Sequence, residues 1–598
     1  MSDELIARTR ETVRGAQSRL LEARGADGEW NYGAHLGLHF SSQYALVASW
    51  LGLSTTRFDF TRWRGKLALT QLPDGSWAQV KDENLPSGDL NATLFNYWAL
   101  KSRGERVDSP SLSRARDFVL RAGGVEASAH FTKVFLALFG NYDWRQTAYV
   151  PYVIFLDGLP LNYRSFSQWV IPHLMPIAYL RHCRARRDLG PSFQVDELFV
   201  SQAPERARLP NERKPRKLWD GLLIEKLYGL QQPAGSWGGY TVSTLLSLMA
   251  LDHYEQKLPS AGNRFPYVKH RGLEFVEELY FAAGAAQDLG ALMDGRYWDT
   301  LLACNALLDS RADLANVRPS AERIANIQQP GGGVPYGIDF ECAPDVDDTA
   351  EAVLLLSHWP EFRPHVERAC AWLLAMQNRD GGWGAFDRNN EGNVVLRLAA
   401  AGYDNSVDLF DDSSPDSTGN VLEALGSQSL HLQHPDVVRR AVAYLRAQQD
   451  PASGAWSGRW AINWIFGTAC VVVGLTRVGE RPESPYLARA LDWLENRQNP
   501  DGGFGESTRS YLEPDWKGRG VSTAAQTGIA LWALCRGGRR GRPTARRAAA
   551  HLVEQFERDG KWADATVTGT GHPGLLYMVY PSYAEAFPLV ALGHFLRD

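Results

Sequence analysis

Apolar and polar residues follow one another along this chain mainly with the period of an amphipathic helix. Runs such as VERACAWLLAMQ (366–377) and YLARALDWLENRQ (486–498) carry apolar residues at every third or fourth position, which places them on one helix face. A short glycine-containing segment ends each run, and glycine is the natural residue just past a helix end. Another helix-like stretch then follows. The pattern predicts helix, turn, helix units and an all-α fold.

A degenerate repeat marks these turns. It reads QLPDGSW (71–77), QQPAGSW (231–237), QNRDGGW (377–383) and QNPDGGF (498–504), with looser copies ending at Trp30, Trp456 and Trp562. The amide of the repeated Gln can bond backbone groups left unpaired at helix ends, and the indole can stack over the turn. We therefore interpret the repeat as a structural brace.

The spacing of the repeat predicts how the units assemble. Neighbouring aromatic positions lie 47 to 49 residues apart in several places, as from Trp30 to Trp77 and from Trp456 to Phe504. Self-similarity at such a period indicates stacked units that bury a core only together. The spacing leaves open whether they form an open solenoid or a closed ring. The pattern is weakest between Trp77 and Trp237 and densest after Val334, which favours two helical domains.

Composition limits the classes of function. The chain has 598 residues, 44% of them hydrophobic, and a formal net charge of -5, so a globular core is expected and a nucleic-acid partner is not. Six cysteines without CxxC spacing indicate neither a zinc site nor a disulfide framework, and they fit a reduced cytoplasmic compartment. The N-terminus resembles no signal peptide, and no apolar run is long enough to span a bilayer.

A cluster of acids stands out in APDVDDTAEAVL (343–354). Pro344 suits the first turn of a helix, and the apolar spacing that follows predicts one, so Asp345, Asp347 and Asp348 are expected at a helix N-terminus. Like charges at close range cannot all ionise, so one pKa must rise, and a dry site raises it further. Taken alone, however, an acidic trio after a proline favours a simple helix cap.

The repeats, DVDDTA (345–350), GRWAINWIFGT (458–468) and TGTGHPG (568–574) together closely resemble the bacterial squalene-hopene cyclases, which are class II triterpene cyclases. The resemblance covers nearly the whole chain. It implies two α/α barrel (toroid) domains that enclose a central cavity. Residues 17–281 would form the non-catalytic barrel, and residues 1–16 with 282–598 the barrel that carries the acid motif.

The resemblance also implies a mechanism. Asp347 would protonate an alkene, with Asp345 and Asp348 polarising and holding it, and Asp416 would lie close by. Aromatic faces would then stabilise the carbocations, each by roughly 0.5 to 2 kcal/mol. The positions that match aromatic residues of the family's cavity are Trp169, Trp298, Tyr336, Phe386, Trp460, Tyr580 and Tyr583. For each of them, ordinary core packing is the competing interpretation.

Four departures from the family pattern bear on the substrate and on proton handling. Asn420 stands where the family has a histidine partner of the acid, and an amide cannot relay a proton. Phe466 replaces a tyrosine of the same network. His572 replaces a phenylalanine, where it could end the cascade as a base or simply bond a backbone group. Only 20 residues, 211–230, replace a long membrane-dipping insert, although LWDGLLIEKLYGL could still rest on a bilayer surface.

The sequence thus predicts a protonation-initiated terpene cyclase without cofactor or metal. The expected substrate is squalene or a shorter or functionalised polyprenyl chain, with a prenylated aromatic or a prenyl diphosphate as the alternative. A magnesium-dependent synthase using DDSSPD (411–416) is a rival, although Pro415 and the paired serines predict a loop there. A zinc-dependent prenyltransferase subunit and a non-catalytic helical scaffold are the others. We expect a cytoplasmic protein, peripheral on the inner face of the cell membrane, with a homodimer left open.

Overall fold

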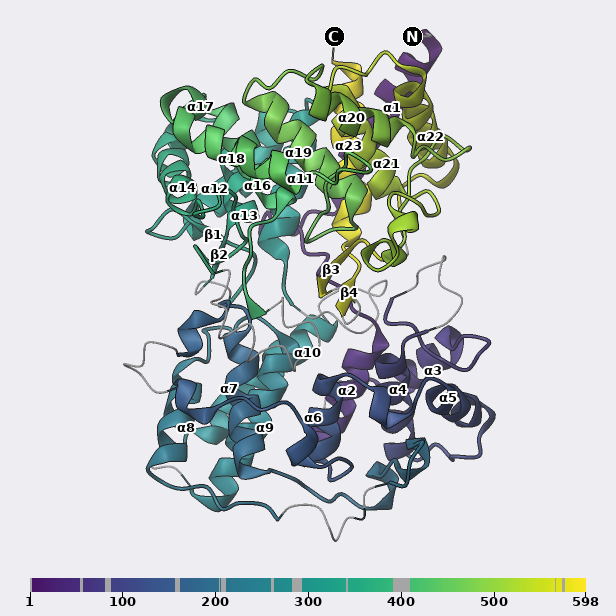
Figure 1. Cartoon of the computed structure of the whole chain (residues 1–598), viewed down its shortest axis with the longest axis vertical. Helices are drawn as coiled ribbons and strands as arrows, with labels where there is room; N and C mark the ends of the chain where they lie inside the picture. Colours follow the sequence, from purple (N-terminus) through teal and green to yellow (C-terminus); the bar gives the residue numbers. More distant parts are fainter. Residues whose placement is uncertain are drawn as a thin grey trace.

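The computed structural model describes most of the chain. The described residues are 3–53, 58–80, 88–155, 162–203, 205, 211–259, 263–281, 293–339, 343–390, 409–564, 566–572 and 576–597. Helices dominate them, and they gather in two lobes (Figure 1). The structure is therefore all-α, as the helical period predicts.

One lobe is a double ring of helices. Six nearly buried helices contact one another in sequence and close on themselves, because the last also packs against the first. These inner helices are α11 (Arg296–Asp309), α13 (Val346–Leu356), α16 (Pro415–Ser427), α19 (Trp464–Arg477), α21 (Ala524–Arg536) and α23 (Pro581–Leu596). Ring closure, which the repeat spacing leaves open, comes from these contacts.

Amphipathic helices cover the inner ring from outside, each packed on one or two inner helices. They are α12 (Leu314–Ile327), α14 (Arg363–Ala375), α18 (Pro435–Gln448), α20 (Pro485–Glu495), α22 (Pro543–Asp559) and α1 (Asp3–Glu22), and the short α17 (Leu430–Gln433) precedes α18. α1 is one continuous helix that packs on α22 and α23. The predicted domain division between residues 16 and 17 therefore cuts through this helix.

The second lobe contains the helices from α2 to α10 (Figure 1). α2 packs on α4 and α9, and α9 also packs on α7, α8 and α10. The bounds are α2 (Leu38–Trp50), α3 (Phe60–Thr70), α4 (Leu90–Ser102), α5 (Pro110–Arg121), α6 (His130–Leu138), α7 (Ile171–Cys183), α8 (Trp219–Gly229), α9 (Thr241–Lys257) and α10 (Phe265–Phe281). α10 ends at the other predicted division of the chain, and residues 282–292 after it lie outside the described ranges.

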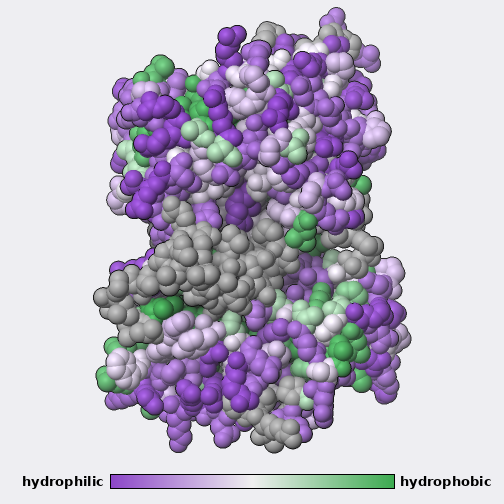
Figure 2. All heavy atoms as spheres, viewed as in Figure 1, coloured by the Kyte–Doolittle hydropathy of each residue, from purple (hydrophilic) through white to green (hydrophobic). Residues whose placement is uncertain are grey.

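Two short antiparallel ribbons accompany the helices of the first lobe. β1 (Val334–Pro335) pairs with β2 (Pro344–Asp345), and β3 (Gly569–His572) pairs with β4 (Leu576–Met578). β3 and β4 point toward the waist between the lobes (Figure 1). In Figure 2 the outer surface of both lobes is mostly hydrophilic. Within the described ranges, no helix is both long enough and apolar enough to span a lipid bilayer.

The Gln and Trp of the repeat tie one unit to the next. Gln377 donates from Nε2 to the carbonyl oxygens of Gly381 and of Val437, both at 2.9 Å, and Trp383 donates from Nε1 to Leu373 O at 2.8 Å. The first bond closes the turn and the second reaches the next outer helix. The same pair of Gln bonds recurs at Gln71, Gln231, Gln328, Gln449 and Gln498.

The turn itself requires glycine. Gly381 has a φ of 97°, and a Cβ there would lie 2.5 Å from the carbonyl oxygen of Arg440. Glycine alone combines this backbone conformation with so close an approach. The repeat therefore positions the outer helices against one another and contributes no side chain to a site.

We predict that Gln377→Ala destabilises the protein by about 1 to 3 kcal/mol, because two backbone carbonyl groups lose their buried donor. Urea unfolding followed by circular dichroism measures the change. Gln428→Ala is the control, since Gln428 donates only to the neighbouring Ser427 side chain, and it should change stability by about 0.5 kcal/mol or less. Equal stability of the two variants would contradict the brace.

Candidate active site

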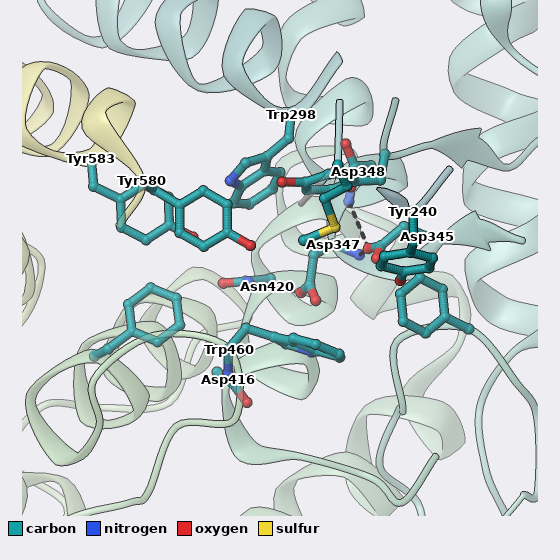
Figure 3. Close-up of a pocket in the computed structure, with 14 residues that line it drawn as sticks. Tyr240, Trp298, Asp345, Asp347, Asp348, Asp416, Asn420, Trp460, Tyr580 and Tyr583 are labelled. Carbon is teal, nitrogen blue, oxygen red and sulfur yellow. Dashed lines mark hydrogen bonds between the residues drawn. The ribbon is translucent and has the colours of Figure 1, made fainter. Parts of the chain in front are cut away.

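A pocket of about 590 Å³ lies at the N-terminal end of the inner ring. Five inner helices, α11, α13, α16, α19 and α23, begin at or next to residues that line it, and Tyr240 at the start of α9 adds a side chain from the other lobe. The lining residues are Tyr240, Met293, Trp298, Tyr336, Asp345, Asp347, Asp348, Phe386, Asp416, Asn420, Trp460, Phe466, Tyr580 and Tyr583 (Figure 3).

The acidic motif begins the inner helix α13. Asp345 is its N-cap and accepts hydrogen bonds from the backbone N–H groups of Asp347 at 2.6 Å and Asp348 at 3.2 Å. The prediction that Pro344 occupies the first helical turn is wrong: Pro344 pairs with Pro335 in the short ribbon, one residue before the cap. The ribbon fixes the chain entering α13, so the first turn presents Asp347 to the pocket.

Asp347 points into the space between Trp298, Trp460 and Asn420 (Figure 3). Asn420 donates from Nδ2 to Oδ1 of Asp347 at 2.9 Å, and Ser417 donates from Oγ to Oδ2 at 2.8 Å. Both donors lie on α16, one turn apart. Each carboxyl oxygen of Asp347 therefore has a neutral donor that stabilises the anion.

The pKa of Asp347 reflects opposing effects. Burial raises it most, the nearby charge of Asp416 raises it further, and the bonds from Asn420 and Ser417 lower it, so that the pKa lies at about 7. Burial and the charges of the neighbouring carboxyls also raise the pKa of Asp345 and of Asp348 well above its usual range. The three groups thus cannot all be ionised at neutral pH. Asp347 combines a retained proton with donors ready to stabilise its anion.

Asp416 acts on the pocket wall and makes no hydrogen bond to Asp347 among those described. Its Oδ2 accepts from the backbone N–H groups of Arg459 at 2.8 Å and Trp460 at 3.1 Å. The prediction that Pro415 lies in a loop is wrong, because Pro415 and Asp416 form the first turn of α16 after the N-cap Ser414. This helix start brings Asp416, Ser417 and Asn420 to one end of the barrel.

Aromatic rings form much of the remaining wall. Phe386 and Trp460 meet edge to face with ring centroids 5.8 Å apart, and Tyr580 and Tyr583 stack at 4.9 Å. Asp411 fixes Phe386, since its Oδ2 accepts from the backbone N–H of Phe386 at 2.6 Å. Such faces stabilise positive charge without offering a nucleophile.

Two of the predicted site residues are not among the pocket lining. Trp169 packs against the small apolar cluster that contains Phe386, with Trp460 on the same cluster. His572 belongs to β3, where it pairs with Leu576, and its side chain lies outside the described residues. The roles assigned to both stay predictions.

Three residues of the site were not predicted: Tyr240, Met293 and Ser417. A signal for Tyr240 exists in the sequence, because it follows the repeat residue Trp237 by three positions, just as Phe386 follows Trp383. Ser417 and Met293 have no comparable signal. Among the described residues, no three His, Cys, Asp or Glu side chains are grouped as they would be to hold a metal ion.

Comparison with known proteins decides the family. The profile of the squalene-hopene cyclase C-terminal domain matches residues 296–597, and that of the N-terminal domain matches residues 13–230. The chain belongs to the squalene-hopene cyclase family. It is 39% identical to squalene-tetrahymanol cyclase of Tetrahymena thermophila, over 95% of this chain and 89% of that protein.

Two further similarities agree with the squalene-hopene cyclase family. The squalene-hopene cyclase of Alicyclobacillus acidocaldarius is 32% identical, over 98% of this chain and 97% of that protein. The structure of ent-copalyl diphosphate synthase from Streptomyces platensis is similar with a TM-score of 0.56 at 17% identity, over 98% of this chain and 99% of that chain. The second similarity concerns the fold alone. The all-α double toroid and the assignment as a terpene cyclase enzyme are confirmed.

We predict that Ser417 sets the pH at which the reaction rate of this squalene-hopene cyclase family member falls on the alkaline side of its pH profile. With Asp347 as the predicted proton donor, only its protonated form reacts, so the single-turnover rate should fall as pH rises through about 7. Ser417→Ala removes a donor to the anion, which raises the pKa of Asp347. The falling limb should move to higher pH, while the maximal rate drops about tenfold because the acid is weaker.

The pH profile of rapidly quenched single turnovers measures both effects. Ser427→Ala is the matched control, because Ser427 lies at the opposite end of α16 and donates to Ala424 O. Its profile should match that of the wild type. A limb that stays in place or moves to lower pH in Ser417→Ala would refute the role of this donor.

Proposed function

We propose that the enzyme cyclises a linear polyprenoid by protonating one of its double bonds. The observation that carries the proposal is Asp347 itself, 8% exposed, with a pKa of about 7 in a pocket walled by aromatic rings. An isolated alkene is a very weak base. A carboxyl group that stays protonated near neutral pH, and whose anion is stabilised after transfer, meets this requirement.

The proposed steps balance within the substrate. The O–H bond of Asp347 breaks as a C–H bond forms at one alkene carbon, and the other carbon becomes a cation. Successive double bonds attack this cation and close rings, while the faces of Trp298, Trp460 and Phe386 stabilise the moving charge. The last cation loses a proton or takes up water. Asn420 and Ser417 hold the carboxylate of Asp347 during the cascade.

The relatives' names favour squalene as the first substrate to test. Squalene appears in the names of the relatives that are 39% and 32% identical over nearly the whole chain. The shortened segment 211–230 and the residue differences at Asn420 and His572 keep a shorter, functionalised or aromatic-linked polyprenyl chain as the alternative. Incubation with squalene, a geranylgeranyl compound and a prenylated aromatic, followed by product analysis, separates these substrates.

We predict that Asp347→Asn abolishes product formation, because an amide cannot donate the proton, and that the variant stays folded. Burial raises the folded-state pKa of Asp347, so the wild type loses stability as pH rises from about 4 to about 7. Each pKa unit is worth about 1.4 kcal/mol. In thermal unfolding, Asp347→Asn should therefore be more stable than the wild type at pH 8, and this difference in stability should be smaller at pH 5.

Asp564→Asn is the matched control for this experiment. Asp564 is half-buried beside the start of the inner helix α21, where it accepts from the N–H groups of Ala524 at 2.9 Å and Ala525 at 2.8 Å, but it does not line the pocket. Its variant should keep turnover. Near-normal product formation by Asp347→Asn would overturn the proposed function.

We also propose peripheral contact with a membrane through the start of α8. Leu218, Trp219 and Leu222 are at least half exposed, and exposed basic residues precede them at positions 213, 214, 216 and 217. Exposed apolar side chains beside basic ones are typical of a helix that lies in the bilayer interface. This surface would place the enzyme where an apolar substrate dissolves.

We predict that the protein sediments with vesicles containing anionic lipid, and that Trp219→Ser with Leu222→Ser reduces the bound fraction about tenfold, since apolar burial at the interface is lost. Turnover of a detergent-dispersed substrate should not change. Leu432→Ser is the control, because Leu432 is even more exposed but lies in the other lobe. Equal binding by all variants would contradict this surface.

A further inference from the structure

A second cavity, of about 980 Å³, lies at the opposite end of the inner ring. The inner helices start at the reaction pocket and end here, so this cavity is lined by their later turns. Its charged and titratable residues are Asp309, Glu351, His358, Glu423, Arg477, Arg536, His594 and Arg597. The two cavities thus share the same helices, and the proposed chemistry makes no use of the second.

Two glutamates stand between the cavities. Glu351 follows Asp347 by four residues on α13, and Glu423 follows Asn420 by three residues on α16, so each lies about one helical turn, roughly 5 Å, beyond the acid site. Asn305 donates from Nδ2 to Oε2 of Glu351 at 2.6 Å. Both glutamates line the second cavity, and both are partly accessible through it.

The surroundings keep both glutamates able to hold a proton at neutral pH. Burial and the charge of Glu423 raise the pKa of Glu351, and the bond from Asn305 lowers it, so that the pKa lies at about 8. Burial raises the pKa of Glu423 to about 7 against the lowering effect of Arg536, Arg477 and Arg597.

Further titratable groups near the two glutamates lie on α11, α13, α19 and α23. Asp309 of α11 raises the pKa of both glutamates, and Asp347 raises that of Glu351. Burial raises the pKa of the Cys470 thiol of α19 most, and the charges of four nearby carboxyls, Asp416, Asp347, Glu423 and Glu351, raise it further. His594 of α23 stays close to Asp309. Cys470 therefore marks the place where the acid site and the glutamates approach each other.

The proposed function leaves Asp347 as a carboxylate after every cycle. Asn420 cannot pass on a proton, because its amide N–H donates a hydrogen bond but is far too weak an acid to release the proton, and Ser417 is fully buried. On its open side Asp347 faces the pocket that holds the substrate. While a substrate or product fills that pocket, the barrel side of Asp347 offers a separate route for a proton, past Glu351 and Glu423 to the second cavity.

We propose that Glu351 and Glu423 form a relay that returns a proton to Asp347 from water in the second cavity. The proton on Glu351 passes to the Asp347 carboxylate, Glu423 reprotonates Glu351, and Glu423 takes a proton from water. Each step moves one proton between two oxygen acids, so no other reactant is required. The relay rests on the proposed function of Asp347.

Isotope retention tests the relay directly. The whole enzyme is equilibrated in D2O, diluted into H2O for a variable delay, and then mixed with a cyclised substrate for a single turnover. Mass spectrometry of the product reports how long Asp347 keeps its deuterium. We expect Glu351→Gln to retain deuterium on Asp347 about 100-fold longer than the wild type. Its first turnover should proceed within about twofold of the wild-type rate. Its steady-state turnover should be about 100-fold slower, because Asp347 then regains its proton slowly.

Controls separate the relay from a structural effect. Asp309→Asn alters a carboxyl in the same cavity, but His594 and Arg597 lower the pKa of Asp309, so that it stays ionised and carries no proton. This variant should lose deuterium as the wild type does. Glu423→Gln should resemble Glu351→Gln.

Three outcomes would overturn the relay. In Glu351→Gln, Asp347 could lose deuterium as fast as in the wild type, or the first turnover could be slowed as much as later ones. In Asp309→Asn, Asp347 could retain deuterium as long as in Glu351→Gln. Failure of the proposed function has a different signature. It would appear as product formation by Asp347→Asn, or as product without deuterium even at the shortest delay in every protein.

Discussion

The burial of one carboxyl group at the start of an inner helix is the constraint on which the site depends. In water Asp347 would be ionised and useless as an acid toward an alkene. At the N-terminus of α13 it is buried beside other carboxyls, which favours the protonated form, while Asn420 and Ser417 favour the anion. A proton donor needs both effects, since burial retains the proton and the hydrogen bonds stabilise the anion that forms when the proton leaves.

The closed ring of inner helices provides both the burial that retains the proton and the donors that stabilise the anion. Five of the six inner helices begin at or near one cavity, so their first turns bring acids, donors and aromatic rings together from distant parts of the chain. The positive ends of the helix dipoles also face that cavity and favour a carboxylate there. The same helices end at a polar cavity on the other side. One architecture thus separates a pocket walled largely by aromatic rings from a cavity lined largely by charged groups.

Two of the predicted departures from the family pattern, Asn420 and Phe466, lie in the pocket wall beside Asp347. Asn420 keeps the hydrogen bond that a partner of the acid must make, yet it gives up proton transfer and positive charge. Phe466 makes the same side of the pocket apolar. The opposite end of the barrel carries the ionisable side chains of Glu351 and Glu423.

By itself the sequence determined the helical period, the repeated Gln, Gly and Trp turns, and the acidic trio at a helix start, because these depend on residues close together in the chain. The closed ring, the bonds from Ser417 and Asn420 to Asp347, and the place of Tyr240 required tertiary structure. The bonds to Asp347 join residues 70 and 73 positions apart, and the ring closes where α23 packs on α11. No local pattern encodes contacts between such distant parts of the chain. Pro344 and Pro415 show the same limit. Strand pairing with Pro335 places Pro344 before the N-cap of α13, whereas Ser414 caps α16, so that Pro415 takes the first helical position that proline favours.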